Sequence, residues 1–410
     1  MDPAPTLPAG FREFLGNEAA VESLRAAIAA GRLPHSLILS GPAGAGKYTL
    51  ALMLAMAVEC QRQPRELSSS GQSLACFCGV CSNCTRIAGA ADLEEQVAAA
   101  VLAREDLRET DKKETRVLIQ PHPDLLILPP DPPQLLIKLG QVRTHIQRAH
   151  YLPSEAPRKL FILTSASMMK EAANSLLKVL EEPPDTVLIL ILAENPGELL
   201  PTIRSRCATV RLGALPVEEV EALLAARRPG VPAKQRSLIA RLAQGAAGRA
   251  LAFDLDSYTA ARADALIFLR NAAGAQSGNK SGAPSKTAPS SWVGSSGVAR
   301  GQELDPDHTA LFKMTETYRA GADGQTKTSA LLRALALLLE DLLLIDSGTT
   351  ELVRNTDLRA ELDRLAAALP FAWIESASHA LDQVHSGLRR NLLRSLSLDA
   401  FAAQLTTPAP

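Results

Sequence analysis

The stretch "SLILSGPAGAGKYTLALMLAMAVEC", residues 36–60, reads as an apolar strand, a glycine-rich turn and an apolar helix. Its turn meets the pattern G-x-x-x-x-G-K through Gly41, Gly46 and Lys47. Glycines let backbone N–H groups approach phosphate oxygens, and a helix N-terminus favours negative charge. We therefore predict a phosphate-binding loop, or P-loop, between a strand and a helix. The expected nucleotide-binding residues are Gly41, Gly44, Gly46, Lys47 and Thr49.

Two parts of a hydrolytic site are missing from the sequence. Tyr48 occupies the position at which a Ser or Thr hydroxyl normally holds Mg²⁺. The strand "LFIL" (160–163) should end in acidic residues, yet no acid occurs between Lys159 and Lys170. Because both losses affect the same metal ion, we expect this chain not to hydrolyse ATP. Binding of ATP without turnover stays open.

The first half of the chain alternates strand-like and helix-like segments, whereas the second half does not. The runs "DLLIL", "RKLFIL" and "TVLILIL" are short and apolar, as buried parallel strands are. From about residue 216 nearly every segment reads as an amphipathic helix. The pattern predicts a parallel α/β domain followed by helical domains.

Composition sets the class of protein. A chain of 410 residues is long enough for two or three domains. Its 43 basic and 44 acidic residues nearly cancel, so net charge does not draw it to nucleic acid or to a membrane. The apolar run at residues 331–345 is shorter than a bilayer span and contains Glu340 and Asp341, which favours a buried helix. No secretory signal opens the sequence, so we expect a cytoplasmic protein without a membrane partner.

Two segments read as insertions. Residues 91–118 are charged and compatible with a helix, with Leu93, Val97 and Val101 on one face. Between residues 272 and 301, thirteen of thirty residues are Gly or Ser, too many for a packed element. We predict a flexible insertion over about residues 272–325.

A cluster of cysteines, "CFCGVCSNC", follows the P-loop helix. Cys78, Cys81 and Cys84 are spaced C-x₂-C-x₂-C, and Cys60 lies near enough in sequence to be a fourth ligand. Four thiolates in a small module predict a structural Zn²⁺. Cys76 is the alternative fourth ligand, and an iron–sulfur cluster is the alternative metal group. Disulfides are disfavoured in a cytosolic chain.

The segment "LEEPP" carries two adjacent acids, Glu181 and Glu182, before Pro183 and Pro184. Adjacent residues lie on different faces of a helix, and proline stops a helix. The segment therefore predicts a helix terminus and not a catalytic pair of carboxylates.

Five motifs together resemble one protein family. In order along residues 33–207 they are "LPHSLILSGPAGAGK", "CGVCSNC", "HPDLLIL", "NSLLKVLEEPP" and "LLPTIRSRC". This order is similar to that of bacterial DNA polymerase III clamp-loader subunits, which are AAA+ proteins. Weaker similarity continues through "GLRRNLLRSLSLDAF" at residues 387–401. Defective metal-binding motifs beside an intact "SRC" resemble the delta-prime type.

The resemblance implies an AAA+ P-loop α/β domain over residues 1–212, with an inserted zinc module at about residues 60–88. A small helical lid is expected over residues 213–258, and an all-α collar domain over residues 259–410. It also implies a component of the DNA polymerase III holoenzyme. The expected partners are the gamma/tau and delta subunits, the sliding clamp and primer–template DNA.

The same resemblance implies a catalytic role in trans for Arg206 of "SRC", as an arginine finger that enters a neighbouring subunit's ATP site. The ordinary alternative is that Arg206 pairs with an acid at the end of its helix. One rival function is a gamma/tau-like ATPase that uses Thr49 and an unconventional metal site. Another is a stand-alone zinc-bearing DNA-binding module, which the near-neutral net charge disfavours.

Overall fold

The computed structural model describes residues 7–105, 107, 116–132, 135–278, 321–389 and 400–401. The chain forms two compact units, one of Met1–Arg228 with Ala243–Leu251 and one of Pro229–Leu242 with Ala252–Pro410. The predicted lid, residues 213–258, is divided between these two units. The three-domain boundaries thus stay a prediction. None of the helices within the described residues combines the length and the apolar character that crossing a membrane requires.

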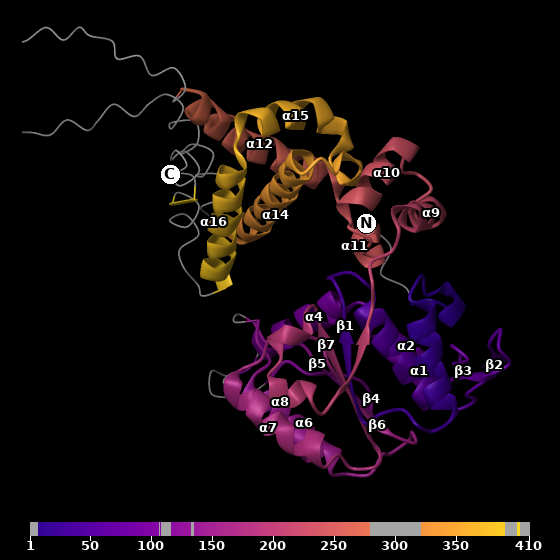
Figure 1. The fold of residues 1–410 in the computed structure, drawn as a ribbon. Helices are drawn as coiled ribbons and strands as arrows, with labels where there is room; N and C mark the ends of the chain where they lie inside the picture. Colours follow the sequence, from indigo (N-terminus) through magenta and orange to yellow (C-terminus); the bar gives the residue numbers. More distant parts are fainter. Residues whose placement is uncertain are drawn as a thin grey trace, which may run out of the picture. The chain divides into compact units, whose positions relative to one another are not determined.

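The first unit is built on a six-stranded sheet in the order β4-β5-β6-β7-β1-β8 (Figure 1). Its strands are β1 (Ser36–Ser40), β4 (Ile119–His122), β5 (Leu125–Leu128), β6 (Lys159–Leu163), β7 (Val187–Ala193) and β8 (Ala208–Arg211). All neighbouring strands pair in parallel except β4 and β5, which are antiparallel. A separate two-stranded hairpin joins β2 (Arg65–Leu67) and β3 (Ser73–Ala75). The predicted parallel α/β fold is confirmed.

Helices cover both faces of this sheet (Figure 1). The helices of the first unit are α1 (Glu18–Ala29), α2 (Lys47–Glu59), α3 (Ser82–Ala88), α4 (Leu93–Glu105), α6 (Leu139–Ala149), α7 (Lys170–Glu181), α8 (Pro201–Arg204), α9 (Val217–Arg227) and α11 (Ala247–Leu251). Two short 3₁₀ turns, η1 (Phe11–Glu13) and η2 (Pro196–Glu198), complete the unit.

Successive side chains of the central strands enter two different cores. In β1, Leu37 and Leu39 pack with α1 and α2, whereas Ile38 packs with α6 and α7. In β6, Ile162 faces the first core and Phe161 the second. The two-residue period of a strand explains this division, and burial on both faces explains why these strands are apolar throughout.

The edge strands were not predicted, because their sequences lack an apolar run. The residues of β8, "ATVR", are mostly exposed, and β4, "IQPH", contains a proline. Edge strands need not be apolar, since one long side has no neighbouring strand. β4 pairs with β5 and β8 pairs with β1 because the segments that flank them in the chain bring them to these positions.

The second unit is helical throughout its described residues, as predicted. It contains α10 (Ala233–Leu242), α12 (Leu255–Gly278), α14 (Gly321–Asp346), η4 (Thr350–Leu352), η5 (Thr356–Leu358), α15 (Arg359–Ala368) and α16 (Phe371–Arg389). The apolar run 331–345 lies within α14 and most of its leucines are buried, which confirms a buried helix.

A buried network explains why an acid interrupts that apolar run. The Asp341 carboxylate accepts hydrogen bonds from the backbone N–H groups of Arg354 and Asn355, both at 2.9 Å. The Asn355 side-chain oxygen in turn accepts from the hydroxyl of Tyr258 and the guanidinium of Arg262, both at 2.9 Å. Every link pairs a donor with an acceptor, so the network joins α12, α14 and the turn before α15 without an uncompensated charge.

Both predicted insertions fall partly outside the described residues. In the first, α4 is a helix whose Leu93 and Val97 pack against the core, but residues 108–115 are not described. In the second, residues 279–320 lie outside the described part of the chain. Helical structure enters this segment at both ends, because α12 continues to Gly278 and α14 begins at Gly321. Most of the motif at residues 387–401 is also not described.

A buried histidine leads to a test of the fold. His145 of α6 is fully buried, packs edge-on against Phe161 at 4.0 Å between ring centroids, and has neither ring nitrogen hydrogen-bonded within the described chain. Burial lowers the pKa of His145 to about 3, from an ordinary value of 6.5. Between about pH 6.5 and pH 3, His145 binds a proton in the unfolded chain but not in the folded chain. The free energy of unfolding therefore decreases as the pH is lowered through this range.

We expect His145→Leu to remove part of the protein's acid sensitivity. Between pH 7 and pH 5 the histidine alone should cost the wild type about 2 kcal/mol of unfolding free energy. Urea unfolding at both pH values measures this cost as the difference between the variant and the wild type. His150→Leu, which changes an exposed histidine one residue beyond α6, is the control and should keep the wild-type acid dependence. An unchanged acid dependence in His145→Leu would contradict the prediction.

Candidate functional site

The P-loop connects β1 to α2 in the conformation that its glycines allow. Gly44 and Gly46 have φ angles of +79° and +82°, which other residues rarely adopt. A Cβ atom on Gly44 would also lie 2.7 Å from the backbone nitrogen of Arg249. Both requirements explain a glycine at this position.

Lys47 is the first residue of α2, and its side chain contacts the start of the loop. Its ammonium donates hydrogen bonds to the carbonyl oxygens of Gly41 at 2.7 Å and Pro42 at 2.8 Å. Burial lowers the pKa of Lys47, while the nearby carboxylate of Glu194 raises it and Arg249 lowers it. The side chain of a phosphate-binding lysine is thus present, and the P-loop itself supplies its partners.

Tyr48 contacts the turn after α3 through its hydroxyl. Its hydroxyl donates a hydrogen bond of 2.7 Å to the carbonyl oxygen of Ala90, in the turn after α3. Its ring packs against the core that contains α2. Burial raises the pKa of Tyr48, so the hydroxyl keeps its proton and remains a donor. Thr49, in the first turn of α2, is only partly buried.

The end of β6 carries no carboxylate. The strand ends at Leu163 and is followed by Thr164, whose side-chain oxygen is buried without a hydrogen-bond partner in the described structure. A hydroxyl cannot supply the negative charge that holds Mg²⁺ at this position in hydrolytic P-loop proteins. The residues therefore fit a phosphate cradle better than a catalytic metal site.

Helix α11 packs directly on the P-loop. The backbone N–H of Gly248 donates to the carbonyl oxygen of Gly44 at 2.9 Å. The side chain of Arg249 donates to the side-chain oxygen of Gln244 at 3.2 Å. Arg249 and Glu194 both influence the pKa of Lys47, so they belong to the same charged surroundings of the loop.

The four predicted cysteine ligands converge. The sulfur atoms of Cys60, Cys78, Cys81 and Cys84 all lie within 4.8 Å of one another. They are the only group of potential metal ligands with three or more members that the described residues bring together, and Cys76 is not part of it. Cys60 follows α2, Cys81 precedes α3, and Cys84 lies within α3.

The sulfur atoms lie in unequal surroundings, and burial raises the pKa of Cys84. Backbone N–H groups of Gln63 and Cys78 each donate to the sulfur of Cys60 at 3.3 Å, and that of Cys81 donates to Cys78 at 3.3 Å. Burial opposes ionisation of Cys81, but N–H donors, first that of Cys84, prevail and lower the pKa of Cys81 to about 6. A soft cation that prefers four sulfur ligands fits this donor set.

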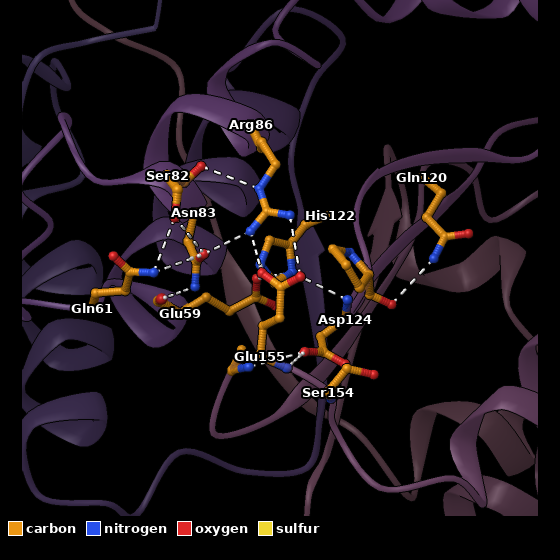
Figure 2. Close-up of polar contacts among 12 residues, drawn as sticks. Glu59, Gln61, Ser82, Asn83, Arg86, Gln120, His122, Asp124, Ser154 and Glu155 are labelled. Atoms are coloured by element: carbon orange, nitrogen blue, oxygen red, sulfur yellow. Dashed lines mark hydrogen bonds and ion pairs between the residues drawn. The ribbon is translucent and has the colours of Figure 1, made fainter.

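A polar cluster, shown in Figure 2, includes Glu59, which precedes Cys60 in the chain. At the end of α2, the Glu59 carboxyl oxygen is 3.1 Å from Nδ1 of His122, and both side chains are fully buried. That Nδ1 already accepts the backbone N–H of Asp124 at 3.1 Å, so it carries no proton. Burial raises the pKa of Glu59 to about 8. The raised pKa favours the uncharged carboxyl of Glu59, which limits the charge buried at this contact. Neither Glu59 oxygen, nor Nε2 of His122, has a hydrogen-bond partner among the described residues.

The cluster extends from there to a loop before β6. The Asp124 carboxylate accepts backbone N–H groups of Ser154, Glu155 and Ala156 at 2.7 to 2.9 Å. Arg86 of α3 pairs with Glu155 (Figure 2). The cysteine module is thus joined to the sheet edge by side chains from α2, β4 and this loop. No local sequence pattern pairs His122 with Glu59, because the two residues lie far apart in the chain.

Arg206 lies on the surface, just after α8. Its Nη2 is 2.7 Å from a carboxylate oxygen of Glu181, the last residue of α7. Its Nη1 donates to the carbonyl oxygen of Thr202 at 2.9 Å. An acid at a helix end was the ordinary alternative for Arg206, and such a pair is present, although the helix is α7 and not α8. The pair does not bury the arginine, whose side chain stays 34% exposed.

Comparison with known proteins places this site in a family. Residues 16–216 match the family model described as "DNA polymerase III, delta subunit". The gamma/tau subunit of DNA polymerase III from Mycobacterium tuberculosis is 31% identical over 223 residues, 53% of this chain and 31% of that protein. The delta-prime subunit from Pseudomonas aeruginosa is 31% identical over 174 residues, 42% of this chain and 41% of that protein. That from Bacillus subtilis is 30% identical over 191 residues, 46% of this chain and 45% of that protein.

The matched part spans less than half the length of each of these relatives, and both subunit types are among them. It contains the P-loop, the four cysteines and Arg206. Residues 16–216 therefore belong to the family of DNA polymerase III clamp-loader subunits.

Proposed function

We propose that the chain is a delta-prime-like subunit of the DNA polymerase III clamp loader. In this role it assembles with gamma/tau and delta subunits and helps to load the sliding clamp on primer–template DNA. The chain does not hydrolyse ATP itself but supplies Arg206 to the ATP site of a neighbouring subunit. The observation that carries the proposal is an exposed Arg206 in the same compact unit as a P-loop without metal ligands.

The state of the P-loop supports a non-hydrolytic subunit. The Tyr48 hydroxyl is used to hold the turn at Ala90, and β6 ends without an acid. Restoring a metal site would need changes at two separate elements. A gamma/tau-like ATPase remains the second candidate because relatives of that type match as well as delta-prime relatives do.

The chemistry of arginine supports the role of Arg206. A guanidinium is always charged and offers a planar set of N–H donors that fits phosphate oxygens. Fingers of this kind raise the rate in other nucleotidases by roughly 10³ to 10⁵. A subunit without its own hydrolytic site still has use for such a motif if it acts on a neighbour's nucleotide.

We also propose that Cys60, Cys78, Cys81 and Cys84 hold one structural Zn²⁺. The convergence of four sulfur atoms within 4.8 Å supports this set, and it favours Cys60 over Cys76 as the fourth ligand. When bound, the metal would tie the hairpin of β2 and β3 and helix α3 to the end of α2. It would have no part in nucleotide chemistry.

Arg206→Ala tests the trans-acting role. The variant should assemble with its partners, yet lower clamp loading and DNA-stimulated ATP hydrolysis by the whole complex about tenfold, less than an isolated finger because several sites share the ring. Arg206→Lys should rescue poorly, because a point charge cannot reproduce the planar set of donors. Arg204→Ala, which changes an exposed arginine at the end of α8, is the matched control. Wild-type rates in a correctly assembled Arg206→Ala complex would refute the role.

Lys47→Ala tests the loss of hydrolysis. In this subunit the change should leave clamp loading nearly unchanged, since no turnover takes place at its own P-loop. The same substitution in the gamma/tau subunits of the complex is the comparison and should abolish most loading. An equally severe loss from both would favour the gamma/tau-like alternative.

The metal content tests the cysteine set. Elemental analysis should find about one Zn²⁺ per chain, and Cys60→Ser and Cys81→Ser should each lose it and make the module sensitive to protease. Cys76→Ser, a change in a neighbouring buried cysteine, should keep the metal. Full metal in Cys60→Ser would transfer the fourth ligand to Cys76, and iron in place of zinc would replace the metal assignment.

A further inference from the structure

The contact between Glu181 and Arg206 is more specific than a chance meeting of surface charges. Arg206 is held at three points, because Nη2 meets Glu181 at 2.7 Å and Nη1 donates to Thr202 at 2.9 Å and to the Ser205 hydroxyl at 3.3 Å. A guanidinium has five N–H donors. These three contacts therefore fix its direction while leaving further donors for another acceptor.

Glu181 is placed where it does not favour its own helix. It is the last residue of α7, and the carbonyl groups at a helix C-terminus repel negative charge. Glu182 follows at the C-cap and adds a second negative charge at the same end. The stability of α7 thus gives no reason for a carboxylate at position 181, whereas the ion pair with Arg206 does.

Arg206 does not need Glu181 in order to stay near α8. It follows the C-terminal end of that helix, where a positive charge is favourable, and it bonds to the carbonyl oxygen of Thr202 within it. The Glu181 carboxylate restricts the long Arg206 side chain to one of its many rotamers. Restricting them before a phosphate arrives lowers the entropy that must be lost in the transition state.

The ion pair between Glu181 and Arg206 contributes little to the stability of the folded unit. Both side chains are partly exposed, 34% for Arg206 and 50% for Glu181, and exposed ion pairs contribute little to stability. Its loss should therefore not unfold the unit. Any effect of Glu181 on the reaction would have to act through the direction of Arg206.

We propose that Glu181 is a positioning residue for the arginine finger. It holds the Arg206 guanidinium so that the donors not used within the subunit meet the γ-phosphate in a neighbouring subunit. Glu181 remains bound to Arg206 during the reaction and does not touch the nucleotide. The inference rests on the proposed function of Arg206.

The test uses the complete clamp-loader complex with variants of this subunit. Glu181→Ala should assemble normally and keep the subunit's thermal stability, yet slow clamp loading and DNA-stimulated ATP hydrolysis about threefold. Glu181→Gln should keep more than half of the wild-type rate, because its amide oxygen still accepts an N–H. Glu182→Ala removes the same charge one residue further on and should equal the wild type.

A double variant separates positioning from every other role. If Glu181 acts only through Arg206, Arg206→Ala/Glu181→Ala should be as slow as Arg206→Ala alone. A further loss in the double variant would overturn the inference, as would an unchanged or raised rate in Glu181→Ala while Arg206→Ala is slow. A raised rate of ATP hydrolysis in Glu181→Ala would mean that the carboxylate inhibits Arg206. Wild-type rates in Arg206→Ala would instead refute the proposed function itself.

Discussion

Burial of α2 along nearly its whole length is the constraint on which the first unit depends. From Leu50 to Glu59 every residue of this helix is buried. The sheet covers one side of the helix, and α1, α3 and the segment from β3 to Cys84 cover the rest. A helix that is enclosed all round cannot turn or slide without opening several contacts at once. The P-loop lies at its start and Cys60 directly follows its end, so one rigid element sets the places of the nucleotide cradle and the cysteine cluster.

This arrangement gives the change at position 48 a structural meaning. In a hydrolytic P-loop the side chain at this point would reach the metal ion. The Tyr48 hydroxyl instead donates to the carbonyl oxygen of Ala90 and joins α2 to the turn after α3. The side chain at this position therefore makes a structural contact. Arg206 is separate from this contact, because it bonds to residues of α7 and α8.

The polar groups of the two units fall into two kinds with different consequences. Buried ones, such as Asp341 with Asn355 and Asp124 with the backbone of Ser154, have matched donors and acceptors because an unpaired buried group is costly. Exposed ones, such as Glu181 with Arg206, add little stability. The buried networks therefore hold the elements in place, whereas the exposed pair affects the direction of one side chain at the surface.

Much of this protein could be read from sequence where a local pattern has one physical solution. The strand, glycine turn and helix of residues 36–60, the buried parallel strands, the end of α7 before Pro183 and the cysteine spacing are of this kind. Glycine, proline and the two-residue period of strands act within a few residues, so sequence alone determines them. Only tertiary structure decided the edge strands β4 and β8, the partner of Tyr48, the choice between Cys60 and Cys76 in the sulfur cluster, and the pairing of Glu181 with Arg206. Each of these joins residues far apart in the chain, and no local pattern states which distant group will fill the space or satisfy the charge.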